Sequence, residues 1–207
     1  MATKSRERSS TRTGETVYEA AVDLMFERGY HGTSLRDVAR VVGVQMSSLY
    51  YYHESKQALL VAIMEKTTAD LIAVVAEAME GAGSPRERLV AGIRAHVMFH
   101  ATRRKENFVA DSEIRSLEPE ERATIVAMRE RYEQLFRDVL KEGAASGAFV
   151  DVDVSVTLAG LFAMLNGVAT WYRPRGRMSL PEIADQYCTI FLNGIATRRA
   201  PLKPAAS

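Results

Sequence analysis

The chain has 207 residues, of which 47% are hydrophobic and 26% charged, and its formal net charge is +1 at pH 7. This composition is typical of a folded globular protein and argues against intrinsic disorder. The small net charge excludes bulk attraction to nucleic acid, so basic residues would have to act locally. Cys188 is the single cysteine, which excludes an internal disulfide. No uninterrupted apolar run suggests a membrane span or a secretory signal, so we expect a cytoplasmic protein without a membrane partner.

The first fifty residues predict a basic arm followed by one longer helix and two short ones. Residues 1–12 are rich in Lys, Arg, Ser and Thr and are expected to form a flexible arm, and a helix is predicted over 13–28. A short helix follows, because its apolar residues recur at one helical face. Gly43 then allows a left-handed turn, and Leu49 directs a second short helix back to the same core. The apolar residues of the first short helix are Leu35, Val38, Ala39 and Val42.

Two short helices joined by a tight turn are typical of a helix-turn-helix, which presents its second helix to the DNA major groove. The tyrosines at positions 50–52 cannot all be buried, because three consecutive helical residues fan out over about 200° of the helix surface. The alternative is a helical hairpin without a DNA partner, in which these tyrosines lie at the edge of a core.

The rest of the chain predicts further helices. Ser84-Pro85-Arg86-Glu87 and Ser179-Leu180-Pro181-Glu182 have the pattern of helix N-termini, with a Ser cap and a Glu three residues later. Other helices are expected over 56–80, around 107–116, over about 119–147 and over 154–171. No alternating strand pattern or internal repeat is found. The sequence therefore predicts an all-α fold of about nine helices.

Five motifs follow one another in the N-terminal part of the chain: Phe26-x-x-Gly29, Thr33-Ser34-Leu35-x-x-Val38-Ala39, Gly43-Val44, Leu49-Tyr50-x-Tyr52 and Ser55-Lys56-x-x-Leu59. In order and spacing they resemble the TetR family of bacterial transcriptional regulators. The resemblance covers residues 13–62 and implies a DNA-binding head followed by a helical body. The implied division is an arm (1–12), a helix-turn-helix DNA-binding domain (13–58), a ligand-binding and dimerisation domain (59–198) and a disordered tail (199–207).

The predicted DNA contacts lie in and around the second short helix. Ser and Thr hydroxyls can cap the preceding helix or reach phosphates, Gln can pair with adenine, and tyrosines offer rings and hydroxyls. A lysine in the first turn of the next helix is placed to neutralise a phosphate. His53 and Met46 depart from the family pattern and leave the operator contacts open. The predicted contacts are Thr33, Ser34, Gln45, Ser47, Ser48, Tyr50, Tyr51, Tyr52 and Lys56.

The last two long helices are expected to form the interface of a homodimer. The helix over 154–171 has a broad apolar surface interspersed with small residues, which needs a partner. The resemblance implies a four-helix interface between two chains, and a dimer would match two major grooves of a palindromic double-stranded operator. The alternative is a hairpin buried within one chain. The predicted interface residues are Leu158, Leu161, Leu165, Ile183, Tyr187, Ile190 and Phe191.

The resemblance also implies a cavity in the body for a small hydrophobic effector. Methionine and phenylalanine can line such a cavity, although at helical spacing they are also ordinary core residues. Trp171-Tyr172-Arg173-Pro174-x-Gly176 resembles regulators of lipid or steroid catabolism that respond to acyl-CoA thioesters, so an acyl-CoA is the expected effector. The predicted lining residues are Met98, Phe99, His100, Phe108, Met128, Phe162, Met164 and Trp171.

The leading interpretation is therefore a ligand-responsive homodimeric repressor that needs no cofactor. An enzyme is disfavoured, because no nucleophile motif, carboxylate pair or phosphate-binding glycine loop is found. His96 and His100 are four residues apart on one helix, yet no carboxylate or thiol completes a metal site, so no metal is expected. A helical protein adaptor and a transcriptional activator remain alternatives.

Overall fold

The computed structural model describes the backbone of residues 2–195 and the side chains of residues 13–195. The predicted tail 199–207 and the side chains of the predicted arm lie outside this description. The described residues form two compact units, 2–71 with 103–130 and 72–102 with 131–195. The helices α4 (Lys56–Glu80) and α7 (Pro119–Ala145) each contribute one part to each unit. Between residues 2 and 195 the structure contains ten α-helices, one 3-10 helix and no β-strand, which confirms the all-α fold class.

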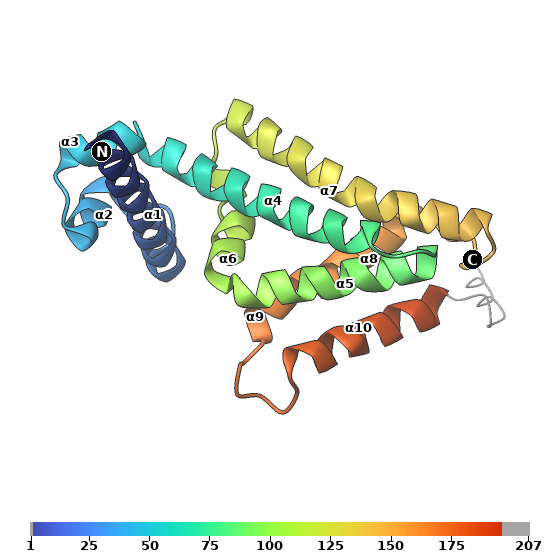
Figure 1. Ribbon diagram of the computed structural model, residues 1–207. Coiled ribbons are helices and arrows are strands. Elements are labelled where there is room, and N and C mark those ends of the chain that lie inside the picture. Colours follow the sequence, from blue (N-terminus) through green and yellow to red (C-terminus); the bar gives the residue numbers. More distant parts are fainter. Residues whose placement is uncertain (1, 196–207) are drawn as a thin grey trace, which may run out of the picture. The chain divides into compact units, whose positions relative to one another are not determined.

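The first unit contains the predicted helix-turn-helix. Its other elements are α1 (Ala2–Arg28), α2 (Leu35–Val42), α3 (Met46–Tyr52), the start of α4, α6 (Arg104–Ser112), the 3-10 helix η1 (Ile114–Ser116) and the start of α7. α1 packs against α2 and α6, and α2 packs against α3 (Figure 1). By contacts, α6 and η1 group with the N-terminal helices, and the functional division at residue 58 stays a prediction.

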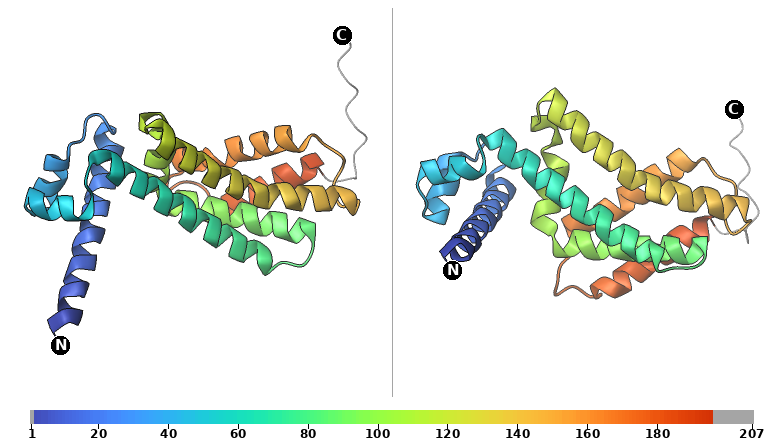
Figure 2. Two further views of the ribbon diagram at one scale, coloured as in Figure 1. Left: turned by 90° about the horizontal axis from the view of Figure 1, so that it is seen from above. Right: turned by 45° about the horizontal axis from the view of Figure 1, so that its top comes forward.

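The first helix is longer than predicted. α1 begins at Ala2 rather than at about Thr13, so the residues expected to form a separate arm continue the helix, as both views in Figure 2 show. No N-cap pattern marks either position in the sequence, and the polar composition of residues 1–12 is compatible with an arm as well as with an exposed helix. α1 ends at Gly29, whose φ of 73° lies in the left-handed region.

Local sequence signals place the ends of α2. Ser34 caps this helix: its hydroxyl accepts the Asp37 N–H, and the Asp37 side chain accepts the Ser34 N–H. Gly43 ends it with φ 75°, a conformation that other residues adopt at a cost of about 1–2 kcal/mol. The core below is completed by Leu49, which is fully buried and contributes on the order of 2 kcal/mol.

The second unit contains the ends of α4 and α7 together with α5 (Pro85–Thr102), α8 (Val154–Asn166), α9 (Val168–Trp171) and α10 (Leu180–Ile195). α5 packs against α8, α9 and α10, and α10 lies alongside α5 in Figure 1. The predicted helix over 154–171 is divided at Gly167 into α8 and α9, which accounts for the additional helix. The predicted capping groups are confirmed, since Ser84 pairs with Glu87 and Ser179 pairs with Glu182.

Candidate nucleic-acid interface

The second helix of the helix-turn-helix has one buried and several exposed positions. Leu49 is fully buried, whereas Tyr50 is 52% exposed and Tyr51 is 79% exposed. Gln45, Ser47 and Ser48 are also exposed. The exposure predicted for this surface is confirmed, and its role as a DNA contact surface stays a prediction. A hairpin whose tyrosines are all packed at a core edge does not fit two exposed rings.

Tyr52 differs from its two neighbours. It is half-buried, its ring meets the Tyr51 ring edge-on at 5.3 Å between centroids, and a Cβ added at Gly14 would lie 3.4 Å from the Tyr52 ring. Tyr52 therefore packs between α3 and α1. The neighbouring His53 is half-buried too, and burial lowers the pKa of its imidazole, so the neutral ring is favoured there.

Thr33 does not occupy the predicted position at the surface. Its side chain is buried, and the Oγ1 hydroxyl donates a hydrogen bond to the Gly29 carbonyl at 3.0 Å. Ser34 alone caps α2, because the Thr33 hydroxyl is engaged at the end of α1. The sequence pattern could not distinguish the two hydroxyls, since both precede the same helix.

Lys56 has a contact that the sequence did not reveal. Its Nζ donates to the Tyr30 carbonyl at 3.0 Å and to the Thr33 carbonyl at 3.1 Å, and it lies 4.0 Å from the centroid of the Tyr30 ring. An ammonium group has three N–H donors, so two of them are used within the protein. A phosphate contact by Lys56 stays a prediction with one donor remaining for it.

Arg36 is an exposed cation that the sequence motifs did not single out. It lies in the first turn of α2, directly after Leu35. A positive charge is unfavourable at the positive end of a helix dipole unless an anion compensates it. In α2 the acidic residue of the same turn is Asp37. Arg40 is exposed as well, and its guanidinium forms an ion pair with Asp37.

The predicted dimer residues are divided between the interior and the surface of the second unit. Leu158, Leu161, Leu165 and Ile183 are buried within the chain, so they belong to its own core rather than to a free face. Tyr187 and Phe191 are half-buried, and Ile190 is 59% exposed. Val156, which was not predicted, is 71% exposed. The periodicity identified the apolar face of α8 correctly but could not say that α5 covers it.

The apolar stretch Val154–Trp171 is largely uncovered within one chain. Its mean hydropathy is 1.5 over 18 residues, and only 28% of it is buried. By length and composition alone, it is the one helical stretch between residues 2 and 195 that could cross a membrane. The expectation of no membrane span was based on uninterrupted apolar runs, and this stretch is not one. Within the fold, α8 and α9 pack on α5.

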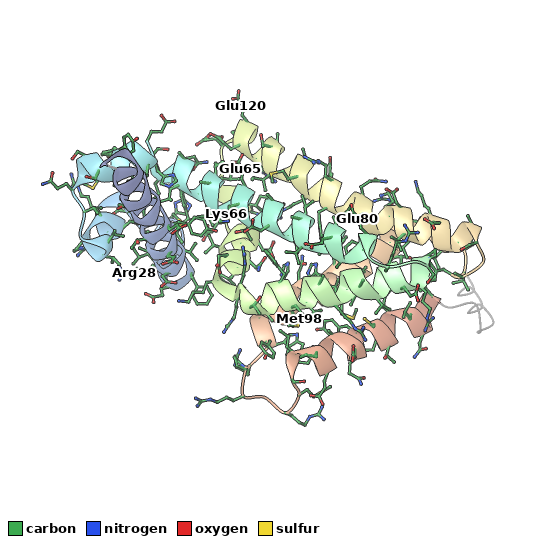
Figure 3. The ribbon with its side chains drawn as sticks, viewed as in Figure 1. Arg28, Glu65, Lys66, Glu80, Met98 and Glu120 are labelled. Carbon is green, nitrogen blue, oxygen red and sulfur yellow. The ribbon has the colours of Figure 1, made fainter. Side chains whose placement is uncertain are left out.

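The predicted effector-lining residues are divided between the two units. In the second unit, Phe99 and His100 are buried, and Phe162 contacts the rings of Tyr132 and Phe136. Met98, labelled on α5 in Figure 3, is partly exposed, as is Trp171, and Met164 is half-buried. Phe108 and Met128 belong to the first unit, where Phe108 packs on Phe26 at 5.1 Å and Met128 packs against the core.

A buried pair of imidazoles is the main polar feature of the second-unit interior. The rings of His96 and His100 are stacked, with centroids 4.0 Å apart and planes 8° apart. His96 Nδ1 lies 2.6 Å from the Tyr132 hydroxyl. Burial, and then His100, lower the pKa of His96 well below its ordinary value, although the Asn166 side chain acts in the opposite direction. His96 is therefore neutral at physiological pH.

Known proteins are similar to this chain in both its N-terminal and its C-terminal part. The family model described as bacterial regulatory proteins, tetR family, matches residues 17–63, and the one described as tetracyclin repressor-like, C-terminal domain, matches residues 82–195. The HTH-type transcriptional repressor KstR2 of Rhodococcus jostii RHA1 is 28% identical over 185 residues, which are 87% of this chain and 90% of that protein.

Two solved structures extend the similarity to three dimensions. The TetR family transcriptional regulator PfmR from Thermus thermophilus has a TM-score of 0.80 and 31% identity, covering 88% of this chain and 99% of that one. AibR in complex with isovaleryl coenzyme A and operator DNA has a TM-score of 0.80 and 26% identity, covering 86% and 97%. Since the C-terminal family model alone spans more than half of the sequence, this chain belongs to the TetR family and is a DNA-binding transcriptional regulator.

Proposed function

We propose that this regulator is a homodimeric repressor that leaves a palindromic operator when it binds an acyl-CoA thioester. The observation that carries the proposal is the similarity, over most of the chain, to a protein solved with both operator DNA and isovaleryl coenzyme A. The similarity to the repressor KstR2 supports repression rather than activation. The proposal assigns the chain a cytoplasmic location and no catalytic step.

The DNA contacts are assigned to the exposed side of α3 and the first turn of α2. Gln45, Ser47 and Ser48 at the start of α3 are placed to meet base edges, and Tyr50 and Tyr51 to meet sugars, phosphates or thymine methyl groups. Arg36 adds a phosphate contact. Because residues 2–195 contain one such helix, two copies of the chain would read two half-sites about 34–36 Å apart.

The dimer surface is assigned to the exposed sides of α8 and α10. Val156 and Ile190 are large apolar residues that the chain itself leaves exposed. The small residues Ala159, Gly160 and Gly194 are exposed on the same two helices and would allow a close approach of partner helices. A second copy of the chain is the partner with the same apolar surface, which is the arrangement of an isologous interface.

The effector is assigned to the second unit. An acyl group needs an apolar interior, which the aromatic cluster of Phe136, Phe162 and Tyr132 supplies. The coenzyme A portion carries several phosphate charges. The loop between α9 and α10 exposes Arg173, Arg175 and Arg177 beside the half-exposed Trp171, and arginines pair well with phosphates.

Release from DNA follows if the effector binds better to the form that does not fit the operator. A ligand with equal affinity for both forms would shift nothing, however tightly it bound. The acyl-CoA must therefore bind the free protein more tightly than the operator complex. By reciprocity, operator DNA must weaken acyl-CoA binding by the same factor.

The test begins with selection of bound fragments from random duplex DNA by the purified full-length chain. A palindromic sequence should be enriched, and its affinity should fall steeply with salt. The complex is then titrated with isovaleryl-CoA and with longer acyl-CoAs, with coenzyme A alone and the free acids as controls. Release by an acyl-CoA but not by the controls supports the proposal. Failure of every chain length to release the DNA contradicts the effector assignment, and the absence of any enriched sequence contradicts the operator.

A further inference from the structure

Segment 113–118, which contains η1, holds the turn that leads into the helix-turn-helix. The Glu113 carboxylate accepts the Tyr30 backbone N–H through Oε1 at 3.1 Å and the Ser116 hydroxyl through Oε2 at 2.9 Å. Tyr30 follows Gly29, the left-handed residue that ends α1, so its N–H lies beyond the helix hydrogen bonds. A carboxylate 83 residues later in the chain supplies the missing acceptor.

Gln57 makes a second connection between the same parts. The Gln57 amide lies 2.7 Å from the Tyr30 hydroxyl. With its amide oriented to satisfy both ends, Gln57 donates to the Ser116 carbonyl at 3.2 Å and accepts the Glu118 N–H at 2.7 Å. The first turn of α4 is thereby linked to Tyr30 on one side and to segment 113–118 on the other.

The Lys56 contacts complete the enclosure of Tyr30. Its ammonium group binds the carbonyls of Tyr30 and Thr33 and lies over the Tyr30 ring. Ser34, the N-cap of α2, is the next residue after Thr33. The turn 29–33 is thus fixed by Glu113 at its N–H side and by Lys56 at its carbonyl side. Any shift of this turn moves the start of α2 and, through the Gly43 turn, α3.

We propose that Glu113 is a positioning residue for operator binding: its carboxylate fixes the turn at Tyr30 from which α2 and α3 follow. The inference rests on the proposed repressor function and concerns how the DNA-binding helices are held. Both Glu113 carboxylate oxygens are engaged within the protein. Glu113 keeps the Tyr30 amide satisfied, because an unsatisfied, partly buried N–H would favour another turn conformation.

A fall or a rise in operator affinity after replacement of Glu113 distinguishes a positioning role of this residue from an effect of its negative charge. Replacement of Glu113→Ala removes both acceptor oxygens and is expected to weaken operator binding at least tenfold. If Glu113 mattered only through its charge, the same change would strengthen binding, because a negative charge near DNA phosphates is removed. Glu113→Gln keeps one acceptor oxygen for the Tyr30 N–H and should restore affinity to within about threefold of wild type. The matched control is Glu120→Ala, since Glu120 extends into solvent from the first turn of α7 (Figure 3).

Two further measurements exclude a general loss of structure. The slope of log affinity against log salt should be unchanged in Glu113→Ala, because no phosphate contact is lost. In the wild-type protein, hydrogen exchange by NMR should show a protected Tyr30 amide, and the protection should fall in Glu113→Ala. Operator binding by Glu113→Ala at wild-type strength or tighter would overturn the inference. If Glu113→Ala does not fold, an unprotected Tyr30 amide in the wild-type protein would overturn it instead. A wild-type protein that selects no duplex at all would instead contradict the function.

Discussion

Arg36 lies at the positive end of the α2 dipole, where a cation destabilises the helix by a few tenths of a kcal/mol unless an anion is nearby. Asp37 in the same turn offsets part of this cost, and a DNA phosphate would be a second compensating anion. Replacement of Arg36→Gln should therefore leave the folded protein as stable or slightly more stable, while operator affinity falls about tenfold and the salt slope decreases by about one per chain. Fluorescence anisotropy at several salt concentrations measures both quantities. An unchanged slope would remove Arg36 from the set of phosphate contacts.

His96 makes the stability of the protein depend on pH. Its folded-state pKa is lowered, so the unfolded chain binds more protons than the folded chain when the pH falls below about 6.5. Stability attributable to His96 is present above that pH and is lost as the pH decreases, by at most about 1.4 kcal/mol per pH unit. Urea unfolding at pH 7.5 and pH 5.5 should show this loss.

The matched variant for this measurement is His96→Gln, which cannot be protonated. It should lose less stability than the wild type between the two pH values, because His53, whose pKa is also lowered, is the same in both proteins. Equal losses in the two proteins would mean that His96 is not buried in its neutral form. A smaller loss in the wild type would reverse the assigned direction.

At the level of single residues, the sequence predicted the exposure of the α3 side chains better than it predicted hydrogen-bond partners. Tyr50, Tyr51 and Leu49 lie where the helical spacing placed them, because their positions depend on three or four neighbouring residues. Thr33 and Lys56 could not be placed in this way. Their hydroxyl and ammonium groups contact the end of α1 and the following turn, and no local pattern reports these tertiary contacts.

At the level of elements, the turn between α2 and α3 depends on Gly43. A Cβ at Gly43 would meet nothing within 4 Å, so Gly43→Ala adds only the strain of a positive φ. We expect a loss of about 1–2 kcal/mol of stability and a clear loss of operator affinity, because relief of the φ strain would shift α3 relative to α2.

Gly147→Ala is the matched control for the Gly43 variant. Gly147 also has a positive φ, of 72°, and nothing within 4 Å of an added Cβ, but it follows α7 in the second unit. Chemical unfolding should show a similar loss of stability in both variants, and only Gly43→Ala should bind the operator more weakly. If both variants lost affinity equally, the effect would reflect stability rather than the reading geometry.

Helix ends with a side-chain cap were predictable, and those without one were not. The Ser-Pro-x-Glu and Ser-x-x-Glu patterns located the starts of α5 and α10, because the cap is formed within four residues. The start of α1 and the break at Gly167 had no such signal. The leucines of α8 show a related limit: periodicity indicated that Leu158, Leu161 and Leu165 lie on an apolar face, but not that one chain buries them by itself.

At the level of the whole molecule, the proposed dimer can be tested through the exposed apolar residues of α8 and α10. Val156 and Ile190 lie on the surface of the single chain, so Val156→Asp with Ile190→Asp should leave each chain folded. A charge buried at a dimer surface is strongly unfavourable, so the double variant should be monomeric by analytical ultracentrifugation. Its operator affinity should fall about a hundredfold or more, since the single DNA-binding domain of a monomer reaches one half-site.

Val126→Asp, at an exposed valine of α7, is the control and should stay dimeric. A double variant that remains a dimer would place the interface elsewhere, because two aspartates per chain could not be accommodated in the surface proposed here.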